Sequence, residues 1–185
     1  MRPSVAAHDA LAELLEYPRD GHAARGRALA SIVSAEVPEA GADLEPYIAF
    51  LEANDLGECE ELYVRTFDGN AERALEVGWQ VFGEQYARGA FLVRLREEMR
   101  IAGVVETTEL PDHMTQVLRL LGRISPDKAL VLIEATAIPS IKRVLADLGA
   151  SHPFSGVLEA VSKTVRSHGA AESAAGAPAA GGIAP

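Results

Sequence analysis

The residues most able to do chemistry are gathered in one short segment, Glu109-Leu110-Pro111-Asp112-His113. A carboxylate beside an imidazole can serve as a general acid-base pair or as part of a metal site. Adjacent residues of a helix do not face each other, however, and no pair of histidines has the i, i+4 spacing of a zinc-binding helix. A helix start, with Asp112 beside the helix dipole and His113 half-buried, explains the same residues. A metal-dependent helical hydrolase that uses Asp112 and His113 therefore remains an alternative interpretation.

The rest of the sequence shows no sign of a nucleophilic cysteine or of a nucleotide-binding loop. The single cysteine, Cys59, lies between Glu58 and Glu60, whose negative charge disfavours a reactive thiolate. One cysteine can form neither an intrachain disulfide nor a thiol-metal cluster, and no G-x-x-x-x-G-K-[ST] phosphate loop is present. We therefore expect a protein that is not an enzyme and holds no permanently bound cofactor.

An interaction surface is the remaining candidate. Half of the ten aromatic residues bracket one segment in the middle of the chain, and three carboxylates accompany them. These residues are Tyr63, Phe67, Trp79, Phe82 and Tyr86, with Asp68, Glu76 and Glu84. A groove of this composition can accept an amphipathic helical peptide that bears arginines. The same aromatic residues can equally fill a core, which is their commonest role. For the protein as a whole, a helical regulatory scaffold is a further alternative.

The elements that must position these residues are helices. Apolar residues recur at i, i+3 and i+4, as at Leu11, Leu14 and Leu15, and no stretch alternates with period two. Helices are predicted over residues 8–17, 23–35, 43–54, 58–67, 84–103, 111–124, 126–149 with a break or kink at Pro139, and 152–165. Pro111 is expected at a first helical position, with Asp112 in the first turn, and residues 38–41 are expected to form a loop. The chain is thus predicted to be an all-α, single-domain bundle of about seven to eight helices over residues 1–168, followed by a flexible Ala/Gly-rich tail at 169–185.

Charge and hydropathy limit the possible partners. The formal net charge is −10, from 27 acidic and 17 basic residues, which repels nucleic acid and favours basic peptides. No run of roughly 20 apolar residues is free of charge, and Asp9, Glu13 and Glu16 interrupt the apolar stretch that a secretory signal needs. We expect a soluble, cytoplasmic protein that neither inserts into a membrane nor binds nucleic acid.

Four phrases, in this order, resemble the NarJ and TorD families of molybdoenzyme maturation chaperones: LLEYP, ELYVRTFD, FGEQYARGAFLVRLREEMRIAGV and ELPDHMTQVLRLL. They span residues 14–121. ELPDH looks like the family's E-x-P-D-H signature at Glu109, Pro111, Asp112 and His113. YVRTFD looks like its Y-x-x-x-F-D element, with Tyr63, Phe67 and Asp68 at the matching positions.

The resemblance implies a TorD/NarJ-like helical fold and a system-specific chaperone. Such a protein binds the N-terminal peptide of a molybdoenzyme catalytic subunit, a twin-arginine signal or its remnant. It assists insertion of the client's cofactor, molybdopterin guanine dinucleotide, before membrane docking or export. The resemblance implies that the loop and the helix from Glu84 contribute to the peptide surface, and that Glu109 to His113 anchor the helix junction beside it. Together with the aromatic run, the expected peptide-binding residues are Tyr63, Phe67, Asp68, Trp79, Phe82, Glu84, Tyr86, Arg88, Glu109, Pro111, Asp112 and His113.

The client and the assembly state follow less directly from the resemblance. The chain reads GWQVFGEQYARG where typical nitrate reductase chaperones carry a tyrosine-rich stretch. This segment is similar to the corresponding segment in chaperones of related dimethylsulfide, ethylbenzene or chlorate-type enzymes. We therefore expect a client that is a nitrate reductase alpha subunit or a related molybdoenzyme, and a chaperone that is a monomer or a weak dimer.

Overall fold

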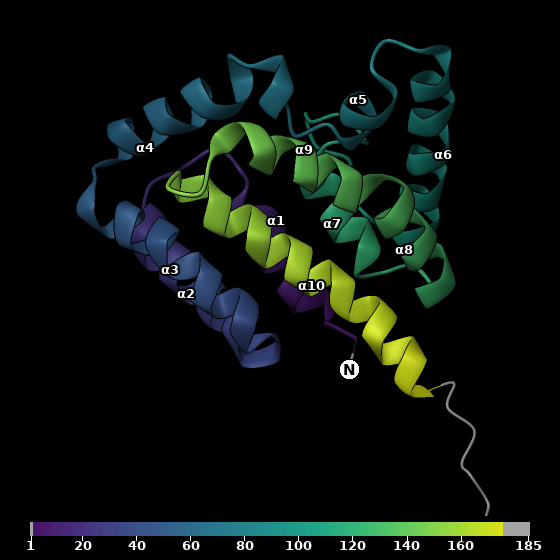
Figure 1. The fold of residues 1–185 in the computed structure, drawn as a ribbon, viewed down its shortest axis with the longest axis horizontal. Helices are drawn as coiled ribbons and strands as arrows, with labels where there is room; N and C mark the ends of the chain where they lie inside the picture. The colour runs from purple at the N-terminus through teal and green to yellow at the C-terminus, as the bar shows by residue number, and fades with distance from the viewer. Residues whose placement is uncertain (1, 176–185) are drawn as a thin grey trace, which may run out of the picture.

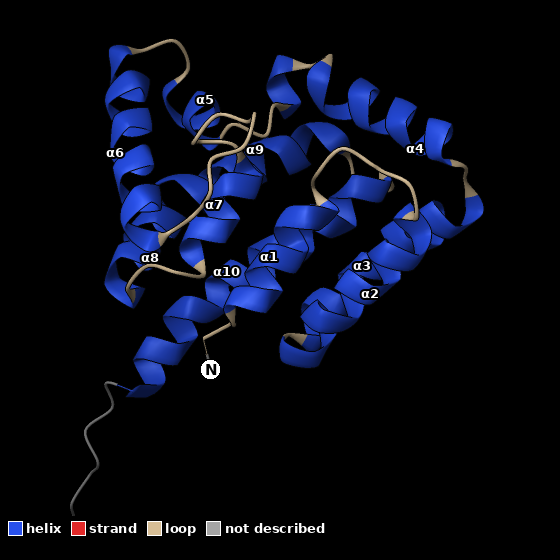
Figure 2. Cartoon of the chain, turned by 180° about the vertical axis from the view of Figure 1, so that it is seen from behind, coloured by secondary structure: helices blue, strands red, loops and turns tan. Residues whose placement is uncertain are grey.

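The computed structural model describes residues 2–175, with side chains through His168, and helices are the only regular elements in that range (Figures 1 and 2). This confirms the predicted all-α fold class. The α-helices are α1 (Val5–Leu14), α2 (His22–Glu36), α3 (Pro38–Ala53), α4 (Leu56–Tyr63), α5 (Val77–Phe82), α6 (Tyr86–Ala102), α7 (Met114–Leu121), α8 (Pro126–Leu132), α9 (Ile138–Leu148) and α10 (Pro153–Ala175). Two π-helical segments, η1 (Val64–Asp68) and η3 (Ile133–Ala137), and one 3-10 turn, η2 (Ala71–Arg73), complete the elements.

Three helices far apart in the sequence form the centre of the molecule. α1 packs against α2, α7 and α10, and α10 also contacts α3, α8 and α9. Figure 1 shows α10 crossing the middle of the fold, with α2 and α3 on one side and α5, α6 and α8 on the other. Every residue of α7 except Arg119 is buried, which fits a helix enclosed by its neighbours. The first and last helices are thus joined in one core.

The turn between α2 and α3 is tighter than the sequence analysis expected. Residues 38–41, predicted to be a loop, are instead the first turn of α3, and Val37 alone connects the two helices. Pro38 occupies the first helical position, where a missing N–H costs nothing. Gly41 is buried where a larger side chain would meet Ser34, so the two helices approach closely. The predicted loop was wrong because close packing, rather than turn composition, decides this connection.

Pro139 does not break the helix in which it lies. α8, η3 and α9 form one continuous helical stretch, and the π-helical turn ends at Ala137, two residues before the proline. Within that turn Ile138 donates its N–H to the carbonyl of Ile133, five residues earlier. A wider turn accommodates a residue that has no N–H and whose ring would clash in a regular α-helix.

The start of α7 corrects a second prediction. His113 is the N-cap and Met114 the first helical residue, so Pro111 is not at a first helical position and Asp112 is not in the first turn. Two long-range hydrogen bonds pull this segment out of the helix. Val77 N–H donates to Asp112 O at 2.8 Å, and Met114 N–H donates to Leu75 O at 2.8 Å. They form an isolated antiparallel bridge between Glu76 and His113.

The regions beside and beyond the core also differ from the prediction. α5 was not predicted, and α6 has only Leu95 and Met99 buried, since it stands at the edge of the fold (Figure 2). α10 continues to Ala175, past the predicted boundary at residue 168, while residues 176–185 of the predicted tail lie outside the described range. Within the described range, no helix is both long and apolar enough to span a membrane.

The crossing of α3 and α10 yields a test of the fold. A methyl group on Gly156 of α10 would collide with the backbone carbonyl of Asp43 on α3. We expect Gly156→Ala to lower the free energy of unfolding by about 1 to 3 kcal/mol, as overpacking does. Urea denaturation measures this change. Gly89→Ala is the matched control, because this exposed α6 position has free space and alanine should stabilise it by about 0.5 kcal/mol. Equal effects of the two substitutions would contradict the close α3–α10 approach.

Candidate functional site

A buried ion pair joins α6 to the start of α7. Arg88 Nε donates to Asp112 Oδ2 at 2.9 Å, and Arg88 Nη2 approaches Asp112 Oδ1 at 3.4 Å. The Asp112 side chain has no exposed surface, whereas the Arg88 side chain is 21% exposed. Two donors of one guanidinium facing two oxygens of one carboxylate define the relative orientation of the two helices. Asp112 is therefore a positioning residue, without free surface for direct contact with a ligand.

α5 completes this junction from the other side. A side chain on Gly78 would collide with the Asp112 carboxylate, so glycine allows α5 to lie against the ion pair. The guanidinium of Arg88 also lies 5.7 Å from the ring centroid of Trp79, a cation–π contact. Trp79 Nε1 donates to Ala71 O at 3.1 Å. Trp79, Arg88 and Asp112 thus hold α5, α6 and α7 together as one unit.

His113 is held in one tautomer by its capping role. Its Nδ1 accepts the N–H of Thr115 at 3.4 Å and lies 2.8 Å from Thr115 Oγ1. Because Nδ1 accepts, the proton of the neutral ring is on Nε2, the nitrogen that faces away from the cap. Burial lowers the pKa of His113, while the nearby carboxylates of Glu109 and Asp112 partly oppose that shift. His113 is therefore a neutral hydrogen-bond donor near neutral pH.

A cleft of about 620 Å³ opens beside His113, within the size range of ligand sites. Its walls come from the end of α1, the α4–η1 segment, the η2 region and the segment before α7. The lining residues are Tyr17, Tyr63, Phe67, Asp68, Gly69, Asn70, Ala71, Ala74, Leu75, Glu76, Glu109 and His113. Aromatic rings form part of the floor, since Tyr63 makes edge-to-face contacts with Tyr17 and Phe67.

The electrostatic character of this cleft is one-sided. Asp68, Glu76 and Glu109 line it, and the described lining residues include no lysine or arginine. None of these three carboxylates belongs to an ion pair within the described chain, in contrast to Asp112. The pKa of the Tyr63 hydroxyl is raised, first by burial and then by the carboxylates of Asp68 and Glu109. Unbalanced negative charge in a partly enclosed cleft attracts cations.

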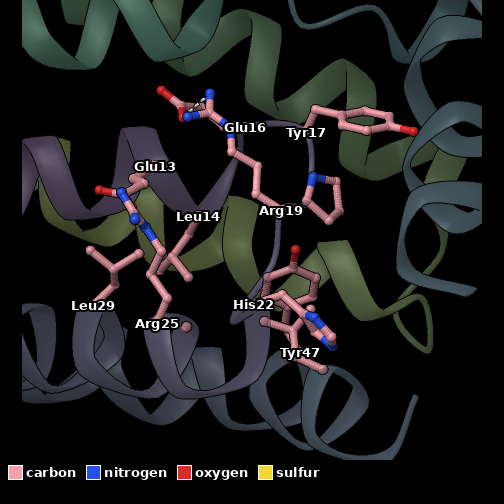
Figure 3. A pocket seen from close by; sticks show the side chains of 12 residues that line it. Glu13, Leu14, Glu16, Tyr17, Arg19, His22, Arg25, Leu29 and Tyr47 are labelled. Carbon is pink, nitrogen blue, oxygen red and sulfur yellow. Dashed lines mark hydrogen bonds and ion pairs between the residues drawn. The ribbon is translucent and has the colours of Figure 1, made fainter. Parts of the chain in front are cut away.

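A smaller pocket on the other side of Tyr17 serves as a contrast. It has a volume of about 50 Å³ and lies between α1 and α2. Figure 3 shows the ring of Tyr17 directed away from Glu13 and Arg25. Here the carboxylates are already neutralised, because Glu13 pairs with Arg25 and Glu16 pairs with Arg19 and Arg119. This pocket has neither the room nor the unbalanced charge of the larger cleft.

A third cavity is apolar and lies at the far end of α5. The groove has a volume of about 510 Å³ and runs between α6, α7 and the α8–η3 segment. Phe82 and Phe91 line it, with ring centroids 5.4 Å apart, together with Leu95 and Val131. Val131 is 68% exposed, which is unusual for a large apolar residue beside a groove. The groove therefore offers apolar surface that the described chain leaves uncovered.

The structure distributes the twelve predicted binding residues over several places. Five line the acidic cleft: Tyr63, Phe67, Asp68, Glu109 and His113. Phe82 lines the apolar groove instead, and Trp79, Arg88, Pro111 and Asp112 belong to the junction between them. Glu84 lies in the exposed turn before α6, and Tyr86, the first residue of α6, is 93% exposed; neither residue lines a cavity. The predicted surface is thus two cavities separated by α5.

Sequence reasoning did not assign Tyr17 to the site, and it named Glu76 only as a carboxylate beside the aromatic groove. Tyr17 follows α1 and reaches the cleft only because the chain folds back beside Tyr63, 46 positions later. Its place in the LLEYP phrase was the one available signal. Glu76 was recognised as a flanking carboxylate, and its backbone bridge to His113 places it beside the signature segment.

No protein-family model matches the chain, and no curated protein sequence matches it. Within the described residues, no three His, Cys, Asp or Glu side chains are grouped to hold a metal ion. Asp112 and His113, the pair of the hydrolase alternative, are engaged by Arg88 and Thr115 respectively.

The Arg88–Asp112 pair predicts a large stability effect from a small substitution. Asp112→Asn keeps the shape but leaves the Arg88 guanidinium without its counter-charge. We expect the free energy of unfolding to fall by about 2 to 3 kcal/mol, less than for a fully buried pair because Arg88 is partly exposed. Glu97→Gln is the control, since it removes an exposed pair with Arg100 and should change stability little. Denaturation midpoints that fall equally for both variants would show that Asp112 has no special role.

Proposed function

We propose that this protein is a chaperone that binds the arginine-bearing N-terminal peptide of a molybdoenzyme catalytic subunit. The observation that carries the proposal is the acidic cleft with aromatic residues in its floor. Tyr63, Phe67 and Asp68 from one signature and Glu109 and His113 from the other line this single cavity, although the signatures are about 40 residues apart in sequence. These five are among the twelve residues expected to bind the peptide, and they are the ones that line the cleft.

The chemistry of the cleft suits a guanidinium group. Arginine side chains bind carboxylates through paired N–H donors and stack on aromatic faces. Asp68, Glu76 and Glu109 supply acceptors, and Tyr17, which is 43% exposed, supplies ring surface beside the buried Tyr63. His113 adds a donor through Nε2, which an acceptor such as a peptide carbonyl can use. The cleft can therefore bind both the side chain and the backbone of an arginine-bearing segment.

The apolar groove extends the same proposal to an amphipathic peptide. α5 separates the two cavities, with Glu76 at its N-terminal end and Phe82 at its C-terminal end. Six helical residues span about 9 Å, a distance that two to three turns of a bound helix easily cross. A peptide with arginines in the cleft could bury apolar side chains against Phe82 and Phe91. Charge would then determine its register, and apolar burial would add affinity.

In this role the protein acts on a folding client and performs no reaction itself. Binding of the N-terminal peptide holds the catalytic subunit, a nitrate reductase alpha subunit or a related molybdoenzyme, until molybdopterin guanine dinucleotide has been inserted. The cofactor belongs to the client, and the chaperone needs only to bind and release. Dissociation constants between micromolar and nanomolar, about −8 to −12 kcal/mol, permit both steps.

Calorimetry with a synthetic arginine-bearing peptide from the N-terminus of a molybdoenzyme catalytic subunit tests the proposal. We expect Glu76→Gln and Glu109→Gln each to weaken binding by about 1 to 2 kcal/mol, because each removes a charged acceptor. Glu134→Gln, an exposed carboxylate on η3 outside the cleft, should leave the affinity unchanged. Replacing the peptide's arginines by glutamine should abolish the difference between wild type and the cleft variants. Absence of binding at tens of micromolar would overturn the proposed function.

Glu84 predicts a kinetic effect of a different kind. It is exposed at the turn before α6 and lines neither cavity, so it can steer a basic peptide without contacting it in the complex. We expect Glu84→Lys to slow association and flatten its salt dependence while leaving dissociation unchanged. Stopped-flow measurements at several salt concentrations separate the two rates. A faster dissociation of the Glu84 variant would place this residue in the interface instead.

A further inference from the structure

Two buried histidines from opposite ends of the chain are joined by a direct hydrogen bond. His8 of α1 and His168 of α10 have their Nε2 atoms 2.9 Å apart, and their rings meet edge to face. Exposure is 0% for His8 and 3% for His168. The α7 end closes this region from a third side, since a side chain on Gly122 would contact His8. The contact joins residues 160 positions apart at the place where three core helices meet.

The hydrogen bonds determine where the ring protons are. His8 Nδ1 lies 2.7 Å from Ser4 O, a carbonyl that can only accept, so this nitrogen carries the proton of the neutral His8 ring. His8 Nε2 is therefore an acceptor, and His168 Nε2 must donate to it. The remaining nitrogen, His168 Nδ1, has no proton in the neutral pair. It is buried without a hydrogen-bond partner.

An added proton must therefore arrive at His168 Nδ1, and the surroundings do not stabilise it. Arg2 is the nearest cation, and its guanidinium is bound to the carbonyls of Leu121 and Ile124 at 2.8 and 2.7 Å. A second positive charge beside Arg2 is unfavourable in a buried site.

The carboxylates near the pair already have other partners. Asp9 on α1 pairs with Arg123, which follows α7, through two contacts of 2.7 Å. Glu36 at the end of α2 accepts hydrogen bonds from the backbone and hydroxyl of Ser4. On α10 itself, Arg166 is exposed and adds only positive charge. The described residues therefore leave no carboxylate free to pair with a charged His168.

We propose that His8 and His168 form an acid-sensitive clasp that holds the C-terminal part of α10 against the first turns of α1 and opens when the pair takes up a proton. This device is separate from the acidic cleft and does not rest on the proposed peptide-binding function.

The direction of the pH effect follows from the protonation of the closed state. Burial is the main reason that the pKa of His168 is lowered from 6.5 to about 4, and the neighbouring His8 and the charge of Arg2 add to this shift. The open state binds the proton more tightly, so closure is fully favoured above pH 6.5 and weakens as the pH falls toward 4. Linkage over this interval lowers the closing equilibrium constant roughly 30-fold between pH 8 and pH 5.

Hydrogen exchange of the full chain, corrected for intrinsic rates, tests the clasp. At pH 5 we expect residues 2–14 and 160–175 to open about 30-fold more than at pH 8, relative to α3. The double variant His8→Gln/His168→Gln should show no such change, because glutamine can hydrogen-bond but does not titrate here. His152→Gln is the matched control: burial also lowers the pKa of His152, which lies outside the clasp, so this variant should respond as the wild type does.

Three results would overturn the proposal. They are equal acid opening in the wild type and the double variant, no opening of these segments relative to α3, and loss of the response in His152→Gln. If the double variant does not fold, nitrogen NMR of the wild-type histidines decides the matter. The proposal requires a proton on Nδ1 of His8 and on Nε2 of His168 at pH 7.5, and the opposite tautomers would exclude it.

Discussion

The ion pair between Arg88 and Asp112 is the contact on which the geometry of the candidate site depends. It anchors the peripheral helix α6 to the start of α7, and Gly78 lets α5 approach the same carboxylate. The backbone of Asp112 bonds to Val77, so the same residue also determines where the chain before α5 lies. A buried ion pair contributes little net stability compared with apolar packing, but it has few acceptable geometries. Here that restriction places His113 and the cleft carboxylates beside each other.

The carboxylates of the cleft differ from most other charged groups of the protein, because they have no ion-pair partner among the described residues. Most of the arginines are paired with carboxylates, whereas Asp68, Glu76 and Glu109 face a common space without a cation. The three carboxylates give the cleft a negative potential, which favours a cationic occupant. A trade-off between stability and binding is common: groups that serve a ligand are often not the ones that would stabilise the folded chain best.

Buried histidines make the stability of the fold depend on pH. The pKa values of His8, His113, His152 and His168 are all lowered, in each case mainly by desolvation. Three of these imidazoles have a structural role as a neutral group: His113 is an N-cap, and His8 and His168 link two helices. Acid therefore weakens helix ends and helix contacts together, because the unfolded chain takes up protons that the folded one excludes.

The sequence by itself determined the all-α class and the approximate residue ranges of helices such as α1, α6 and α7. Both depend on local periodicity, and no stretch has the period of two that a strand requires. Tertiary structure alone decided the short α5, the hydrogen-bonded turn before His113 and the helical first turn at Pro38. Each of these depends on a partner distant in sequence, or on a neighbouring helix, that composition does not reveal. The same holds for the site: the signatures named Tyr63 and Glu109, but only the folded chain brings Tyr17 beside them and buries Asp112. Local pattern records which face of a helix is apolar, whereas the identity of the group that covers that face depends on contacts across the whole chain.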